Sequence, residues 1–250
     1  MIRLLIILLC LSMPTIHAGT IDPGVSDHKY TEYAKDFHYI GKICGKDDKG
    51  VKYCASCVVI SKRYFLTAAH VVENVVESKI VINDKEFCVE EIISHKDYSP
   101  DKFGLNDIAI GYVKEDIGLE YYPELYDKND EVGKICSIAG YGLTGNFNTG
   151  AMKSDNKRRA GSNIIDGINK QLLICSPSKP LDKGRTELEF LIASGDSGGG
   201  LFIDGKLAGI NSCVMTEKGS PRSDYRTESG HTRISQHIVW IKRNVRFFRD

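Results

Sequence analysis

Short β-rich runs separated by turn residues recur along almost the whole 250-residue chain. Val, Ile, Leu, Phe and Tyr dominate the runs, and residues 203–207 (IDGKL) have the pattern of a tight hairpin. The alternation of strands with helices that builds parallel sheets is absent from this pattern. The sequence therefore predicts an all-β barrel or sandwich. The expected strands cover residues 55–60, 64–67, 79–82, 87–93, 108–113, 134–139, 172–176, 201–203 and 207–212.

The C-terminal end predicts one helix, over residues 235–248. Apolar residues there recur at steps of three and four, which places them on one face of a helix. Basic residues between Lys242 and Arg249 occupy the other face, where cations near a helix C-terminus interact well with the helix dipole. We interpret this face as solvated, in preference to a membrane or polyanion contact, because the helix is short. The apolar stripe consists of Ile234, Ile238, Ile241, Val245 and Phe248.

Residues 1–18 have the pattern of a signal peptide. A basic start at Arg3 precedes an apolar run from Leu4 to Leu11, and the small residue Ala18 suits signal peptidase. The run is too short for a transmembrane helix, which needs roughly 20 apolar residues. The other interpretation is a buried N-terminal strand or helix. The pattern favours secretion to an extracellular or periplasmic compartment, with a mature domain over residues 19–250.

The charge balance and the cysteine content limit which macromolecules, metals and cofactors the protein is expected to bind. The 33 Lys and Arg balance the 33 Asp and Glu, so neither nucleic acid nor an acidic membrane is expected as the main partner. Cys54-x-x-Cys57 is a weak metal or redox pattern without a second ligand pair, and we expect no metal and no cofactor. Of eight cysteines, Cys10 lies in the signal peptide. The odd number that remains leaves at least one free or intermolecular thiol.

A long stretch, residues 142–167, is polar and rich in glycine and asparagine. We expect it to be an exposed loop. Its basic triplet, Lys157 to Arg159, would then be an accessible site for proteolytic nicking.

Three short motifs carry the residue types that nucleophilic catalysis needs. They are residues 67–70 (TAAH), 106–110 (NDIAI) and 195–200 (GDSGGG). A serine is a weak nucleophile unless an imidazole takes its proton, and the imidazole needs a carboxylate to fix its tautomer. Each motif alone is weak evidence, since a lone histidine can be a core residue and a glycine-rich hexad a turn. Together they predict a triad of His70, Asp107 and Ser197.

With these motifs the chain resembles the chymotrypsin–trypsin family of serine peptidases, from about Phe37 to Ile241. Residues 95–98 (HKDY), 136–142 (CSIAGYG), 209–212 (GINS), 232–235 (TRIS) and 240–241 (WI) are also similar to the family's sequences. The resemblance implies two six-stranded antiparallel β-barrels, with the active site in the cleft between them and a C-terminal helix. The first lobe would cover about residues 21–115, and the second about 130–235.

The resemblance also implies a mechanism and partners. His70 would accept the Ser197 proton as Oγ attacks the scissile carbonyl, and Asp107 would orient His70. The backbone N–H groups of Gly195 and Ser197 would form the oxyanion hole. The expected partner is a polypeptide substrate, protein inhibitors are a second class of partner, and the protein is expected to be a monomer.

Three positions are expected to line the specificity pocket. Where family members specific for Lys or Arg have an aspartate, this chain has Leu191. A cationic side chain would find no partner there, and burying it unpaired is costly. Ser212 and Val214 follow on the pocket wall, and Val214 should narrow it. We therefore expect cleavage after small or medium apolar residues, unless the loop over residues 187–194 is rebuilt.

Activation departs from the family pattern. Family zymogens are cut before Ile-Val-Gly-Gly, and the new ammonium pairs with the aspartate before the nucleophile, here Asp196. No such sequence occurs, and we expect Ile21 to be the pairing residue, with Val25 as a second candidate. Alternatively, Asp196 is satisfied in another way, as a buried carboxylate must be.

Other interpretations stay open at this point. Two cysteine positions of the family are occupied by Val71 and, nearby, Ala193, so disulfide partners cannot be transferred; Cys213 could pair with Cys136 or Cys175. The chain could be a catalytically lapsed binding protein or an esterase that uses the same triad. An α/β-hydrolase elbow also fits residues 195–199, but only about fifty residues follow and βαβ alternation is lacking.

Overall fold

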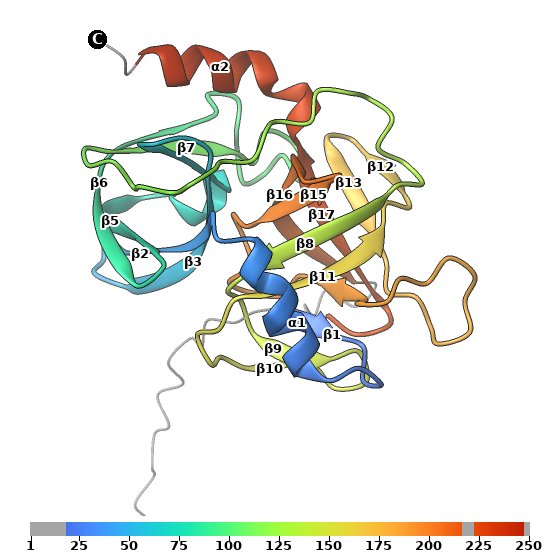
Figure 1. The fold of residues 1–250 in the computed structure, drawn as a ribbon. Coiled ribbons are helices and arrows are strands. Elements are labelled where there is room, and N and C mark those ends of the chain that lie inside the picture. Colours follow the sequence, from blue (N-terminus) through green and yellow to red (C-terminus); the bar gives the residue numbers. More distant parts are fainter. Residues whose placement is uncertain (1–18, 217–222, 248–250) are drawn as a thin grey trace, which may run out of the picture.

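The computed structural model describes residues 19–216 and 223–247. Two β-rich lobes lie side by side, and one helix extends along their top edge (Figure 1). All nine runs predicted as strands form strands. The expected signal peptide, and Phe248 of the expected apolar stripe, lie outside the described residues. None of the described helices is long and apolar enough to cross a membrane.

The first lobe is a closed antiparallel barrel with the strand order β2-β3-β4-β7-β6-β5. Its interior is filled by large apolar side chains without solvent exposure, among them Ile43 and Phe65. A Cβ added to Gly111 on β7 would lie 2.1 Å from Cζ of Phe65, so the ring packs on bare backbone. The strands are β2 (Ile40–Asp47), β3 (Lys52–Val59), β4 (Tyr64–Thr67), β5 (Val75–Ile82), β6 (Lys85–Ser94) and β7 (Ala109–Val113).

The second lobe is an antiparallel sheet of seven strands in the order β11-β8-β15-β16-β17-β13-β12. We expected a six-stranded barrel here. The structure has β12 as a seventh strand at one edge of the sheet, and no ladder among the described residues joins β12 to β11 at the other edge. A separate buried cluster, with Ile138 and Leu201, fills this lobe. The strands are β8 (Ile135–Gly140), β11 (Arg159–Ile164), β12 (Gly167–Asn169), β13 (Leu172–Cys175), β15 (Gly200–Ile203), β16 (Lys206–Thr216) and β17 (Thr227–Arg233).

The N-terminal segment packs on the second lobe although the chain then enters the first. Strand β1 (Thr20–Ile21) lies between β9 (Thr144–Asn146) and β14 (Phe190–Leu191), and β10 (Gly150–Lys153) completes this small sheet. Helix α1 (Asp27–Tyr33) lies beside β11, below the second lobe in Figure 1. We therefore propose a lobe division in which the first barrel begins at β2, and not at residue 21.

The expected exposed loop over residues 142–167 is wrong, because β9, β10 and β11 lie within it. Arg159, expected at a nicking site, has a side chain only 2% exposed. Its guanidinium donates to the carboxylates of Asp27 and Asp155 at 2.6–2.8 Å. We expected Arg159 to be exposed because one of its two carboxylate partners, Asp27, lies far away along the chain and could not be recognised from the sequence.

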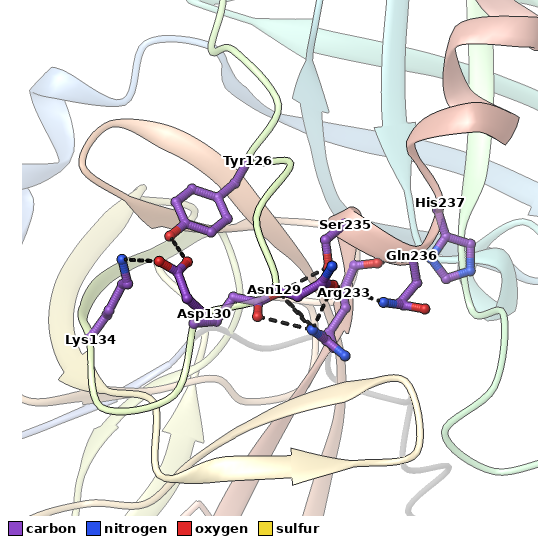
Figure 2. A network of polar contacts seen from close by, with 9 residues as sticks. Tyr126, Asn129, Asp130, Lys134, Arg233, Ser235, Gln236 and His237 are labelled. Carbon is purple, nitrogen blue, oxygen red and sulfur yellow. Dashed lines mark hydrogen bonds and ion pairs between the residues drawn. The ribbon is translucent and has the colours of Figure 1, made fainter.

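The C-terminal helix α2 (Ile238–Phe247) confirms the predicted helix, and a short 3-10 turn (Ile234–Gln236) precedes it. Ile234 and Ile241 are buried in the same cluster as the first barrel. A polar network surrounds the turn before the helix, where Arg233 and Gln236 both donate to Asn129 (Figure 2). Arg233 also forms a buried ion pair with Glu131 at 2.9 Å, and Ser235 donates to the same carboxylate. The segment that links the two lobes is thereby held against the end of β17.

Candidate active site

The three residues of the expected triad come from different elements that meet between the lobes. His70 lies in a 3-10 turn (Ala69–Val71) that follows β4. Asp107 precedes β7, directly after Asn106, whose φ is 56°. Ser197 lies in the loop between β14 and β15, beyond Gly195 with a φ of 90°. This conformation favours glycine, and it explains the glycine at that position.

His70 contacts both other residues of the triad. Its Nδ1 lies 2.8 Å from Oδ2 of Asp107, and its Nε2 lies 2.9 Å from Oγ of Ser197. The backbone N–H of His70 donates to Oδ1 of Asp107 at 2.9 Å. When Nδ1–H donates to Asp107, Nε2 is left as an acceptor for the Ser197 hydroxyl proton. The arrangement can therefore remove that proton.

Asp107 is buried and held by more than the histidine. Ser212 Oγ donates to Oδ2 at 2.5 Å, and Thr232 Oγ1 donates to the backbone carbonyl of Asp107 at 3.0 Å. Burial raises the pKa of Asp107, but the hydrogen bonds from His70 and Ser212 outweigh burial and hold this pKa below its ordinary value. The carboxylate is therefore ionised at neutral pH.

The loop that carries Ser197 is tied to the first barrel. Ser56 of β3 donates its hydroxyl to the Gly195 carbonyl at 2.9 Å and its N–H to the Ser197 carbonyl at 2.9 Å. Within the described residues, the N–H groups of Gly195 and Ser197 donate to no protein acceptor. Two free amides are what an oxyanion site requires. The sequence analysis missed Ser56, because nothing in its neighbourhood distinguishes it from any strand serine.

Asp196, between these two amides, is fully buried. The N–H groups of Ala193 and Gly142 donate to its carboxylate at 2.9 and 2.8 Å, and the N–H of Gly19 donates as well. Burial raises the pKa of Asp196 to about 7 despite these bonds. Ile21, which we expected at this carboxylate, instead pairs with Phe190 in the sheet. Gly19, and not Ile21, is therefore the residue of the N-terminal segment that reaches Asp196. Its position depends on β1, which has only two residues and is too short to show a strand pattern in the sequence.

Of the three expected pocket residues, Ser212 contacts the triad, through Asp107. Leu191 and Val214 line neither of the two clefts beside His70. Leu191 is fully buried in β14, and Val214 in β16 is partly buried against the apolar cluster of the second lobe. Val214 pairs with Ser229, whose hydroxyl lies 3.0 Å from Nε2 of His231.

Two clefts flank His70. One, of about 360 Å³, has Tyr98, Phe103 and Leu105 among its lining residues. The other, of about 310 Å³, runs past Ser197 and is bordered by Tyr53 and Val71. An extended chain could thus pass His70 and Ser197 with side chains on both sides of the triad.

The cysteines pair differently from our expectations. Cys44 on β2 and Cys54 on β3 form a disulfide, which removes Cys54 from any Cys54-x-x-Cys57 metal or redox pair. The two suggested pairings of Cys213 are wrong: Cys213 has no disulfide. Cys136 and Cys175 instead face each other on neighbouring parts of the second lobe.

Fold and geometry together define a serine-hydrolase type of site, and comparison with known proteins identifies the family. The trypsin family model matches residues 29–241. The chain therefore belongs to the trypsin family of serine proteases.

Individual relatives are distant. Mast cell protease 3 of Ovis aries is 28% identical over 99% of this chain and 98% of its own length. Mast cell protease 8 of Mus musculus is 24% identical over 99% of both chains, and a chymotrypsin of Phaedon cochleariae is 28% identical over 74% of this chain and 69% of its own. Among solved structures, mouse neuropsin matches with a TM-score of 0.66 at 20% identity, covering 84% of this chain and 95% of that one. This last match supports the trypsin-like fold.

Proposed function

We propose that this protein is a secreted serine endopeptidase that cleaves polypeptides through His70, Asp107 and Ser197. The observation that carries the proposal is the position of His70, within 2.8 Å of Asp107 Oδ2 and 2.9 Å of Ser197 Oγ. Membership of the trypsin family supports a polypeptide substrate. Export rests on the signal-peptide pattern of residues 1–18, and the disulfide Cys44–Cys54 suits an oxidising compartment.

The reaction begins with transfer of the Ser197 hydroxyl proton to Nε2 of His70 while Oγ attacks the scissile carbonyl carbon. The resulting imidazolium is stabilised by the ionised carboxylate of Asp107. His70 then donates the same proton to the leaving amine, and an acyl-enzyme on Ser197 remains. Water then attacks this ester while His70 takes its proton. His70 returns that proton to Oγ as the acyl bond breaks, which releases the new C-terminal carboxyl group and regenerates free Ser197.

Negative charge on the substrate oxygen would be stabilised by the N–H groups of Gly195 and Ser197. These amides are free of protein acceptors within the described residues, so they need no rearrangement to bind an oxyanion. Removing one such donor from an oxyanion site typically costs about 3–4 kcal/mol of transition-state stabilisation.

For specificity we propose small or medium apolar residues before the scissile bond. Leu191 offers no charge to a basic side chain. His231, whose Nε2 contacts Ser229 opposite Val214, is one candidate cation for an acidic side chain. Burial lowers the pKa of His231 to about 3, so this ring is neutral at physiological pH. Ser229 and Asn211 satisfy both of its ring nitrogens. Neither kind of charged side chain would therefore be compensated on burial.

A fluorophosphonate probe and a peptide-library digest, applied to the same purified protein, test the proposal. We expect Ser197 to be labelled, labelling to vanish in Ser197→Ala, and cleavage to follow apolar residues. Ser154→Ala, at an exposed serine after β10, is the matched control and should label normally. Labelling with ester but no peptide hydrolysis would favour an esterase. No labelling of a protein with an intact fold would indicate a lapsed, ligand-binding relative.

A further inference from the structure

The turn between β12 and β13 brings the second lobe into contact with the segment that carries Asp107. The two strands form a hairpin, and Lys170 and Gln171 are its connection, with a φ of 55° at Lys170. Gln171 lines neither of the two clefts beside His70, and the sequence analysis did not identify it. The turn instead contacts residues 103–106, directly before Asp107.

Gln171 contacts this segment with both its side chain and its backbone. Its side-chain oxygen Oε1 accepts a hydrogen bond of 2.7 Å from the backbone N–H of Asn106. Its own N–H donates to the Gly104 carbonyl at 3.3 Å. Its carbonyl accepts a hydrogen bond of 2.8 Å from the N–H of Arg233, which fixes Gln171 to the end of β17. One residue of the second lobe thus holds two residues of the first lobe.

Asn106 has a backbone conformation that needs such support. Its φ of 56° lies in the left-handed region, which is unfavourable for residues with a side chain, although asparagine tolerates it better than most. The Asn106 side chain contacts the Asp97 carbonyl and Nε2 of His237, both at 3.4 Å, which is long for a hydrogen bond. The 2.7 Å bond from the Asn106 N–H to Gln171 is much shorter than either of these contacts.

The other supports of Asp107 come from the same lobe. Ser212 of β16 donates to its carboxylate, and Thr232 of β17 donates to its backbone carbonyl. Thr232 pairs with Leu172, the residue that follows Gln171. The contacts of Gln171 and Thr232 with the segment around Asp107 therefore arise at one place on the second lobe.

We propose that Gln171 is a positioning residue for the reaction: its amide oxygen holds Asn106 in the conformation that points the Asp107 carboxylate at His70. The link is local, because φ and ψ of Asn106 set the direction in which the next residue leaves the chain. Without an acceptor at Gln171, the Asn106 N–H loses its partner and the segment relaxes to a commoner conformation. Oδ2 of Asp107 would then no longer lie 2.8 Å from Nδ1 of His70. The inference rests on the proposed peptidase function.

Two substitutions of similar size test the proposal. Gln171→Met removes the acceptor, and Gln171→Glu keeps an oxygen at the same place. We expect Gln171→Met to lower kcat about tenfold with little change in KM, since leaving a donor without its partner typically shifts an equilibrium by about that factor. Gln171→Glu should restore kcat. Gln236→Met is the matched control, because Gln236 is exposed and donates to Asn129; its kcat should equal that of the parent protein.

Proton NMR gives a readout that does not depend on turnover. The Nδ1–H proton of His70 resonates at low field while it is held in a short, charge-assisted hydrogen bond to Asp107. We expect this signal in the parent protein, in Gln171→Glu and in Gln236→Met, and its loss in Gln171→Met. Should Gln171→Met fail to fold, Gln171→Ala removes the same acceptor and takes its place in the comparison.

The outcomes separate this inference from the peptidase proposal. Parent-like kcat and a retained low-field signal in Gln171→Met would overturn the inference and leave the peptidase intact. Equal losses in Gln171→Met and Gln171→Glu, together with a lower Tm, would also overturn it, because the role of Gln171 would then be structural. If the parent protein cleaves no peptide and does not react with a fluorophosphonate, the peptidase proposal fails, and the low-field signal alone decides whether Gln171 orients Asp107.

Discussion

Ser212 donates a hydrogen bond of 2.5 Å to Oδ2 of Asp107, the same oxygen that contacts His70. Ser212 was expected only as a pocket residue. In the proposed mechanism, this position makes Ser212 a positioning residue for the carboxylate that orients His70. The bond is a charge-assisted one, and such hydrogen bonds are worth about 1.5–3 kcal/mol.

Ser212→Ala should lower kcat by about tenfold to a hundredfold, because Asp107 loses a donor to its ionised form. Because the pocket wall loses only a hydroxyl, KM should change little. Ser235→Ala is the matched control, since Ser235 donates to the Glu131 carboxylate at 2.9 Å, away from the site. Steady-state kinetics with one peptide substrate would make the comparison. A similar loss of kcat in both variants would mean that Ser212 acts through the stability of the fold and not by positioning Asp107.

Gly198→Ala should abolish fluorophosphonate labelling of Ser197. Gly198 has a φ of 84°, and an added Cβ would lie 2.1 Å from Thr67 Oγ1 and 2.2 Å from the Ser56 carbonyl oxygen. Gly205→Ala is the control, because Gly205 has a φ of 75° but an added Cβ meets nothing within 4 Å. That variant should cost about 1 kcal/mol of stability and leave labelling intact. Normal labelling of Gly198→Ala would mean that the loop relaxes more than its packing indicates.

His231 should make folding stability dependent on pH in the acid range. Its folded-state pKa of about 3 lies below the ordinary value, because burial disfavours the charged ring. A histidine whose pKa is lowered by folding contributes stability that is fully present above the unfolded-state pKa of about 6.5. As pH falls from there toward 3, the free energy of unfolding drops by about 1.4 kcal/mol per pH unit. The free energy of unfolding, measured with urea at several pH values, should change less steeply with pH in His231→Gln than in the parent protein. His28→Gln, at a side chain 77% exposed, should keep the slope of the parent protein.

Cys136 and Cys175 should form a second disulfide in the exported protein. Their Sγ atoms lie 3.9 Å apart, and both residues are buried. Closing this loop would stabilise the fold by up to about 4 kcal/mol, mainly through the unfolded chain. Non-reducing peptide mapping should recover these two residues in one linked peptide, and Cys57, which is buried on β3, as a free thiol. Recovery of Cys136 and Cys175 as free thiols from oxidised protein would refute the pairing.

The sequence was most informative where chemistry requires particular residues in short motifs. The nine strands could be predicted because a strand pattern is local. The motifs were also enough to select His70, Asp107 and Ser197, and the structure brings His70 within hydrogen-bonding distance of the other two. Gly19 could not be found at Asp196, since its position depends on pairing between residues far apart in the chain. Arg159 was misplaced for a similar reason: a charge looks exposed until its distant carboxylate partner is known.

Within the described residues, the first and last elements each pack on the lobe that is not their neighbour along the chain. Strand β1 and helix α1 precede the first barrel but pack on the second lobe. After β17, Ile234 of the 3-10 turn and Ile241 of α2 join the buried cluster of the first barrel. Cutting the chain in the segment between the lobes would therefore give two fragments that each keep a piece of the other's core. Such fragments should be poorly folded when separate and should reconstitute an active complex when mixed.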